Sequence, residues 1–466
     1  MALTEPKMDA VTEPEGVSQS VARFVAELML EDIPEAALIP AKRMLKDWLG
    51  GCVAGGSDGD IDKLVTVAKE LTGDTRCVLI GRPERTGPQE AAMINGAIGQ
   101  VLDFDNSSDE NMGFVASPTL PALFAAAQME PVSGADLLVG FVAALETAIK
   151  IGKAMTVSHY EQGWHPTFTC GVLGAAAGVA RALKLDTGTT LRALSIATTQ
   201  ASGLRSQFGT EIKPVHSGFA ARAGLVSVLL ARQEVTANPR PLEAPSGFFK
   251  TFSGDTSVTG IVMGNPWSLV EPGIKSRIYP CCFCIHRPID AVLDILSRKA
   301  ISAEEVESVD CGVSFWVPDA VSYSRPKTPT EGKFSIEYCL SRTLLEGRRP
   351  IPTDYTPDMI LEPKVVAFIP RINVYIHEEL RERGPGYREF AEVAVHLRDG
   401  ETLTSRIYWP KGTTQNPLSP EELDRKFADC VEPVLDAASI DSFIARLDGL
   451  ETLEDAAGLI EPLTTT

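Results

Sequence analysis

The sequence predicts a mainly α protein in which a large all-helical bundle domain carries an inserted, smaller α+β lid domain. Apolar residues recur at three- and four-residue spacing from about 18 to 237, which is the period of an amphipathic helix. From Leu269 the pattern mixes helical stretches with the strict alternation of strands, and it returns to helix near the C-terminus. We therefore assign residues 1–268 and 405–466 to the helical domain and residues 269–404 to the lid.

The helical segments of the bundle are rich in Ala and Gly, whose small side chains let helices approach closely. Their predicted bounds are 21–29, 36–53, 60–71, 89–104, 118–129, 134–155, 166–185, 189–204 and 214–233. The lid is predicted to hold helices at 288–299 and 335–346 and strands at 306–317, 371–377 and 392–407. Helices at 420–438 and 439–447 complete the pattern.

Charge and composition limit the classes of partner. The chain has 466 residues, enough for two or three domains, and a formal net charge of −19. A surface this acidic repels phosphate backbones and anionic lipid, which argues against nucleic-acid and membrane partners. Residues 1–16 lack the basic and apolar segments of a signal peptide, so we expect a cytoplasmic location. The nine cysteines are then expected to be free thiols.

Three of the six histidines lie beside predicted helix starts. His165 precedes Pro166, His216 follows Lys213-Pro214, and His286 precedes Pro288. Proline is favoured in the first turn of a helix, and a helix N-terminus exposes N–H groups that bind carboxylates. A histidine there can give or accept a proton near neutral pH. If these three segments converge, they form a pocket for a small anionic polycarboxylate, although each histidine could also be a simple cap.

The same segments resemble motifs of the MmgE/PrpD family, and they stand in the family's order along most of the chain. The matching segments are Asn95-Gly96 with Leu102-Asp103-Phe104-Asp105, Gly163-Trp164-His165-Pro166-Thr167, the run 209–218, the run 275–286, and Lys333-Phe334-Ser335 with Tyr338. The resemblance implies a helical domain, a smaller lid and an active site between them. Carried over by position, it implies active-site roles for Asp103, His165, Lys213 and His286, and it includes His216 and Tyr279 in the same motifs.

The family's activities include dehydration of 2-methylcitrate, decarboxylation of cis-aconitate and epimerisation of iminodisuccinate. This chain departs from the family's pattern at Gln100 and in the run 113–118, where many relatives carry a histidine, and at Asn106, where an aspartate is usual. Loss of a candidate acid weakens the dehydratase and decarboxylase readings. The departures therefore favour an epimerase of an iminodisuccinate-like amino or imino polycarboxylate, with dehydration or decarboxylation of a citrate-like tricarboxylate as the alternative.

The predicted mechanism is reversible removal of a proton next to a carboxylate, without a cofactor. Lys213 and either His165 or His286 would act on opposite faces of the substrate carbon, while Asp103 would orient one of them. The cations Arg205, Lys275 and Arg277 are candidates to clamp carboxylates. A non-catalytic dicarboxylate-binding protein is the third reading, and it would hold the ligand without exchanging its α-hydrogens.

Other chemistries are less well supported by the sequence. Cys281, Cys282, Cys284 and His286 are too crowded for a usual zinc site, and a second ligand pair is missing, so we expect no metal. The glycine-rich run 55–59 does not follow a strand and lacks the lysine of a phosphate-binding loop. Helices rich in Ala and Gly also suit a subunit interface, and we expect a homodimer.

Overall fold

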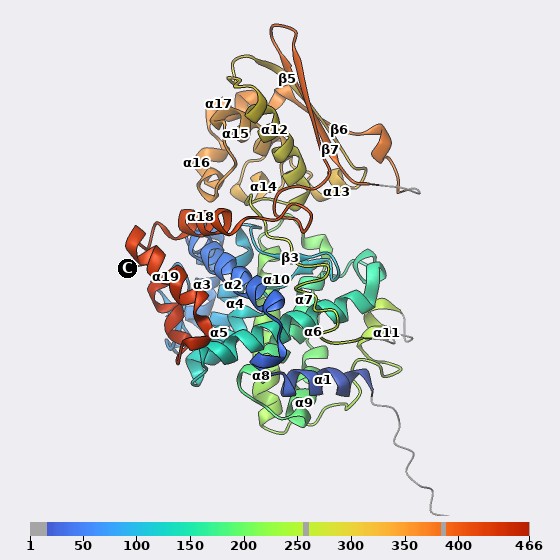
Figure 1. The fold of residues 1–466 in the computed structure, drawn as a ribbon, viewed down its shortest axis with the longest axis vertical. Helices are drawn as coiled ribbons and strands as arrows, with labels where there is room; N and C mark the ends of the chain where they lie inside the picture. Colours follow the sequence, from blue (N-terminus) through green and yellow to red (C-terminus); the bar gives the residue numbers. More distant parts are fainter. Residues whose placement is uncertain (1–15, 255–260, 384–387, 466) are drawn as a thin grey trace, which may run out of the picture.

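The computed structural model describes residues 16–254, 261–383 and 388–465. The chain forms a larger helical part and a smaller part that contains a sheet, stacked along the longest axis of the molecule (Figure 1). This architecture confirms the predicted fold class. The signal-peptide prediction rests on residues 1–16, nearly all of which lie outside the described ranges.

Most of the larger part is helical, and its helices follow the predicted order. The bounds are α1 Val17–Glu27, α2 Glu35–Gly56, α3 Gly59–Leu71, α4 Pro88–Val101, α5 Leu120–Met129, α6 Gly134–Glu161, α7 Pro166–Thr169, α8 Gly171–Ala182, α9 Thr187–Thr198, α10 Ile212–Arg232, α11 Phe248–Ser253, α18 Pro420–Val431 and α19 Ala437–Asp448. Two short ribbons accompany them, β1 (Cys77–Val78) with β2 (Arg85–Thr86) and β3 (Ser107–Ser108) with β4 (Gly113–Phe114).

Two predicted helices differ from the structure near the candidate site. The predicted helix 166–185 is divided at Cys170 into α7 and α8. The predicted helix 189–204 ends at Thr198, and the segment that follows contains Gly203, which has a left-handed φ of 98° and whose carbonyl accepts the N–H of His165. His165 itself occupies the N-cap position of the one-turn helix α7.

Helix α10 is central to the larger part and packs against α4, α8 and α9. Glycines allow the close approach to α4, since a Cβ on Gly96 would lie 2.6 Å from the Cα of Gly218. Among the described residues, α10 alone is long and apolar enough to cross a membrane by length and composition. However, 61% of the most apolar 18-residue stretch of this helix is buried inside the protein, as in a core helix.

The smaller part is built on a four-stranded mixed sheet. Its strands are β5 (Val306–Val313), β6 (Ile372–Ile376), β7 (Ala391–Leu397) and β8 (Thr402–Ile407), in the order β6-β5-β7-β8. Strands β5 and β6 are parallel, and the other neighbours are antiparallel. The stretch 392–407 was predicted as one β segment, but a turn with Gly400 at φ 92° divides it into a hairpin.

Helices cover one face of this sheet. Helix α12 (His286–Arg298) packs on β7 and β8, and α15 (Ile336–Glu346) packs on α12 and β6. Every second residue of β7 is fully buried, which is the pattern of a strand with one face against a core. The short helices are α13 (Val317–Ala320), α14 (Pro329–Gly332), α16 (Pro357–Ile360) and α17 (Pro363–Phe368).

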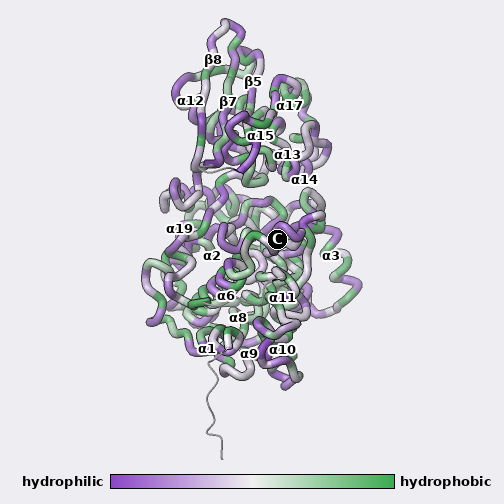
Figure 2. Tube along the Cα trace, turned by 90° about the vertical axis from the view of Figure 1, so that its right-hand side faces the viewer, coloured by the Kyte–Doolittle hydropathy of each residue, from purple (hydrophilic) through white to green (hydrophobic). Residues whose placement is uncertain are grey.

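Two hydrophobic cores correspond to the two parts. The larger core draws on residues between 17 and 269 and on the C-terminal helices, while the smaller one draws on residues between 278 and 418. Figure 2 shows the two masses joined at a narrower region, with apolar segments in both. The predicted domain boundaries stay a prediction, and β8 runs through the boundary placed between residues 404 and 405.

Candidate active site

Asp103 occupies an unusual backbone conformation just beyond the end of α4. Its φ is 52°, in the left-handed region that Asp and Asn enter more readily than most other residues. Its N–H donates to the carbonyl of Gln100 at 2.9 Å, as in a left-handed helix cap. The residue is only 3% exposed. Residues held in this region cluster at functional sites, so the conformation itself supports the assignment of Asp103.

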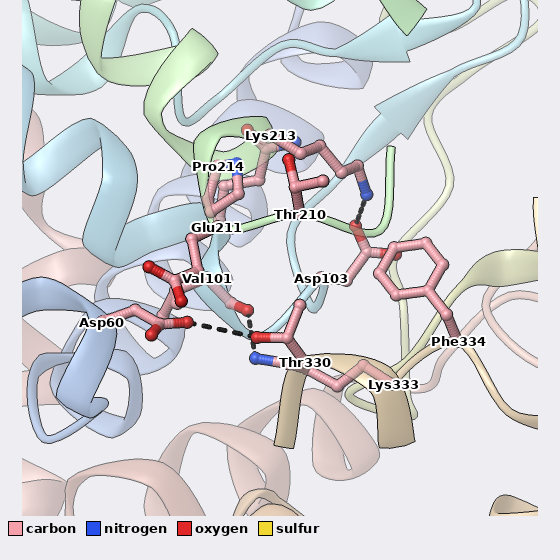
Figure 3. Close-up of a pocket in the computed structure, with 11 residues that line it drawn as sticks. Asp60, Val101, Asp103, Thr210, Glu211, Lys213, Pro214, Thr330, Lys333 and Phe334 are labelled. Carbon is pink, nitrogen blue, oxygen red and sulfur yellow. Dashed lines mark hydrogen bonds and ion pairs between the residues drawn. The ribbon is translucent and has the colours of Figure 1, made fainter. Parts of the chain in front are cut away.

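The Asp103 carboxylate lies between two cations. Lys213, in the first turn of α10, pairs with Oδ1, and Arg277 pairs with Oδ2 while also donating to the Asp103 carbonyl at 3.1 Å. Burial alone would raise the pKa of Asp103, but the charges and hydrogen bonds of Arg277 and Lys213 outweigh burial and lower it. Asp103 is therefore ionised. Figure 3 shows the Lys213 ammonium directed at this carboxylate.

Phenylalanine rings surround the two cations. The Lys213 nitrogen lies 4.8 Å from the ring centre of Phe334, 5.4 Å from Phe114 and 5.5 Å from Phe208. The Arg277 guanidinium lies 4.5 Å from the ring centre of Phe114. Such rings attract a cation and also exclude water, which strengthens electrostatic interactions in the site. Sequence reasoning missed these rings as site residues, because an isolated phenylalanine resembles any core residue.

His165 and His216 form a hydrogen-bonded pair beside Lys213. Their Nδ1 atoms are 2.9 Å apart, so one ring donates and the other accepts. Burial lowers the pKa of His165 well below its usual value, and His216 and Lys213 add to the effect. Burial and the Lys213 charge lower the pKa of His216 to about 4. Both rings are neutral at pH 7.

His286 lies on the Arg277 side of Asp103. It is the first residue of α12, it is fully buried, and it contacts the rings of Tyr279 and Phe283, whose centres lie 4.9 and 4.8 Å away. Burial and the Arg277 charge lower its pKa well below the usual value. The Tyr279 and Cys281 backbones are near, yet neither ring nitrogen makes a hydrogen bond of ordinary geometry to a described residue.

Three residues predicted to bind substrate have other partners. Arg205 donates to the Tyr160 carbonyl at 2.9 Å and stacks on its ring, with the guanidinium carbon 3.6 Å from the ring centre. Lys275 pairs with Asp109 at 2.5 Å. The Tyr279 hydroxyl donates to Asp290, while its ring touches His286. The structure thus places these three around the cluster formed by Asp103, Lys213, Arg277 and the histidines.

A small pocket opens beside Lys213 and Asp103, with about 280 Å³ of empty space that is partly open to solvent. Gln100 and Lys333 also line it, and sequence reasoning assigned neither as a site residue. The Lys333 ammonium donates to the Val101 carbonyl at 2.7 Å (Figure 3). Across the described ranges, we find no group of three or more His, Cys, Asp or Glu side chains arranged to hold a metal ion.

The site thus combines a buried carboxylate between two cations with neutral histidines near each cation. The chain belongs to the MmgE/PrpD family. Residues 19–260 match the MmgE/PrpD N-terminal domain, and residues 279–448 match the MmgE/PrpD C-terminal domain.

Similar proteins include cis-aconitate decarboxylases from a fungus and from mammals. The Aspergillus terreus enzyme is 27% identical, and the match covers 96% of each chain. The Mus musculus enzyme is 26% identical over 95% of this chain and 92% of its own. The Homo sapiens enzyme is 26% identical over 95% of this chain and 93% of its own. The similarity therefore extends over both parts of the fold.

Proposed function

We propose that this protein moves a proton at a carbon next to a carboxylate in a small polycarboxylate. The observation that carries the proposal is the buried triad of Lys213, Asp103 and Arg277 between neutral histidines. The triad has one negative and two positive charges, so a carboxylate from the substrate would complete its charge balance. Arg277 Nε and both nitrogens of His286 make no ordinary hydrogen bond to described residues, so the Arg277 Nε–H and the single N–H of neutral His286 can donate to that ligand.

The local charges favour particular acid–base roles. Lys213 forms an ion pair with Asp103, and this arrangement suits a proton donor or a stabiliser of an enolate. In the His165–His216 pair, the ring that donates through Nδ1 keeps a lone pair on Nε2, and the other ring carries Nε2–H. The pair therefore offers a base on the Lys213 side, and neutral His286 offers a second group on the Arg277 side.

Two groups on separate sides of the triad suit removal of a proton from one face and its return to the other. We therefore propose epimerisation of an iminodisuccinate-like substrate as the reaction. The second candidate is decarboxylation of cis-aconitate, which is supported by the full-length similarity to cis-aconitate decarboxylases. Decarboxylation also needs an acid to protonate carbon after carbon dioxide leaves, and Lys213 could supply that proton.

Proton NMR in deuterated water separates the two reactions. Single-stereoisomer iminodisuccinate should gain deuterium at the α-carbon while the other stereoisomers appear. With cis-aconitate, loss of carbon dioxide and new vinylic signals would instead establish the decarboxylase. A protein that binds either compound without any exchange or product would overturn the proposal and leave the non-catalytic reading.

The variant Lys213→Ala should lower turnover by about 100- to 1,000-fold, the range seen when an electrostatic stabiliser of the transition state is removed. Asp103 keeps its ion pair with Arg277 in this variant, so the fold should remain intact. Lys63→Ala is a matched control, because Lys63 is exposed and pairs with Glu211 next to the same pocket. Turnover of Lys213→Ala equal to that of Lys63→Ala would remove Lys213 from the mechanism.

A further inference from the structure

A buried lysine from the C-terminal helix α18 reaches the back of the site. Lys426 is 1% exposed, and its ammonium has three oxygens within hydrogen-bond distance. It donates to the Arg277 carbonyl at 2.6 Å and to the Phe104 carbonyl at 3.0 Å, and it pairs with Asp47 at 2.6 Å. Lys426 thus makes two hydrogen bonds to backbone carbonyls and one ion pair.

The two carbonyls belong to the backbone that carries the site. Phe104 follows Asp103 directly, and Arg277 is the residue whose side chain pairs with the Asp103 carboxylate. The side chains of Asp103 and Arg277 join these two segments through their ion pair. Lys426 joins the same two segments through their backbone carbonyls. We propose that Lys426 is a positioning residue. It fixes the backbone next to Asp103 and at Arg277, so that these two side chains keep their positions relative to Lys213. The inference rests on the proposed function of this site.

The strained backbone at Asp103 explains why such a bond is needed. A left-handed φ at a residue other than glycine persists only where the surroundings hold it in place. The Asp103 N–H to Gln100 holds one side of the peptide, and Lys426 holds the carbonyl of the next residue. Asp47, the counter-ion of Lys426, is itself held by the Asn106 amide at 2.9 Å, from the same loop. The network thus closes on the loop that carries Asp103.

A second link shows that the two segments act as a unit. Ser107 and Lys275 exchange backbone hydrogen bonds of 3.1 and 2.9 Å, which pair the loop after α4 with the segment that leads to Arg277. Lys426 joins the same two segments three residues before Ser107 and two residues after Lys275. Loss of its ammonium would leave the Ser107–Lys275 pair and the side-chain bonds of Arg277 to Asp103 and of Asn106 to Ser276 to hold the two segments together.

The test compares Lys426→Met with Lys46→Met. Lys46 is also a buried lysine at the contact of α2 with α18, but it pairs with Asp424 at 2.7 Å and with Asp448 at 3.6 Å. Lys46→Met therefore removes structural ion pairs that lie outside the Lys426 network. In Lys426→Met we expect kcat to fall about 10- to 100-fold with a smaller change in KM, the range for residues that support active-site groups. Lys46→Met should keep kcat within about threefold of the wild type while losing stability.

Hydrogen exchange gives a readout that needs no substrate. Amides in 102–107 and 274–281 should exchange about tenfold faster or more in Lys426→Met, and at the wild-type rate in Lys46→Met. Unchanged exchange in these segments, or equal loss of kcat in both variants, would overturn the inference. If the wild type turns over neither substrate, the proposed function fails, but the exchange result still decides the role of Lys426. If Lys426→Met does not fold, the double variant with Asp47→Asn removes the unpaired carboxylate and carries the same test.

Discussion

At the scale of single residues, the histidine pair shows how burial sets chemistry. Two imidazoles whose Nδ1 atoms lie 2.9 Å apart can share one proton between them, but they cannot both carry a proton on those atoms. Lys213 lies close enough to disfavour a further positive charge on either ring. His165 and His216 thus stay available as neutral groups at pH values where exposed histidines are already charged.

The pH dependence of stability should report this pair. Unfolded histidines titrate near pH 6.5, whereas folded His216 has a pKa of about 4 and that of His165 is also lowered. Between these values the unfolded chain binds more protons, so the free energy of unfolding should fall as the pH drops from about 6.5 to about 4. Denaturant unfolding at several pH values across this range measures the effect. The free energy of unfolding should change more steeply with pH in the wild type than in His216→Gln.

The interval from about pH 7.5 to about pH 8.5 is an internal control for this experiment, because the pair is neutral there in both folded and unfolded chains. The acid limb of kcat/KM should likewise lie well below about pH 6. The prediction would be contradicted if kcat/KM fell near pH 6.5 and the free energy of unfolding changed equally with pH in the wild type and in His216→Gln. That result would show that the rings are solvated and charge independently.

The sequence predicted which residues gather at the candidate site better than it predicted their partners. Asp103, Lys213 and the histidines occupy motif positions, and the structure brings them together. Arg277 was expected to clamp substrate, yet it first pairs with Asp103. Lys275 and Arg205 have partners that depend on folding distant segments together, which no local pattern reveals. For the same reason Phe334 and Lys333 could be noted within a motif but not assigned to the pocket.

At the scale of elements, the crossing of α4 and α10 determines where the site forms. Asp103 lies two residues beyond the end of α4, and Lys213 is the second residue of α10. The two helices meet at Gly96 and Gly218, whose backbones nearly touch. This close approach brings the end of one helix to the start of the other, so that a carboxylate and an ammonium from distant parts of the sequence form an ion pair.

Gly218→Ala should disturb this crossing. The added Cβ would lie 1.9 Å from the Met93 carbonyl of α4, so the helices must separate. We expect a loss of about 1–3 kcal/mol in the free energy of unfolding, typical of overpacking, together with a lower kcat because Lys213 moves relative to Asp103.

Gly51→Ala is the matched control for Gly218→Ala. Gly51 lies inside α2, and a Cβ added there would have no heavy atom within 4 Å apart from near neighbours in its own helix. Alanine there should raise stability by about 0.5–1 kcal/mol, because it removes the flexibility of glycine from a helix interior. Thermal unfolding and kcat for both variants test the idea, and a Gly218→Ala protein as stable and active as Gly51→Ala would refute it.

Periodicity identified most elements because the helices and strands have one face against a core. It failed where the backbone turns without a change in hydrophobicity. The apolar run 166–185 continues through the break at Cys170, and the alternation in 392–407 continues through the hairpin turn at Gly400. Hydrophobic patterns report which side chains are buried, whereas these breaks depend on hydrogen bonds and on φ at individual residues.

At the scale of the whole molecule, residues of the smaller part that line the pocket make polar contacts with the larger part. Lys333 lies just beyond α14 and is 2% exposed. Besides its bond to the Val101 carbonyl at the end of α4, its ammonium pairs with Asp58 at 3.3 Å. Thr330 of α14 donates to Asp60 at 3.1 Å. The smaller part is thus bonded to the larger one at the helix end that precedes Asp103.

Lys333→Met should therefore loosen the contact of the two parts beside the site. The variant loses two charge-assisted bonds, so amides in 329–335 should exchange faster and KM should rise by about tenfold, equivalent to about 1.4 kcal/mol. Lys364→Met is the control, because Lys364 is an exposed lysine that pairs with Glu346 and Glu362 within the smaller part. If exchange and KM are the same in both variants, other contacts, such as the ion pair of Arg349 with Asp429 of α18, must hold the two parts together. If only Lys333→Met changes, one buried ammonium couples the contact between the two parts to the geometry of the pocket.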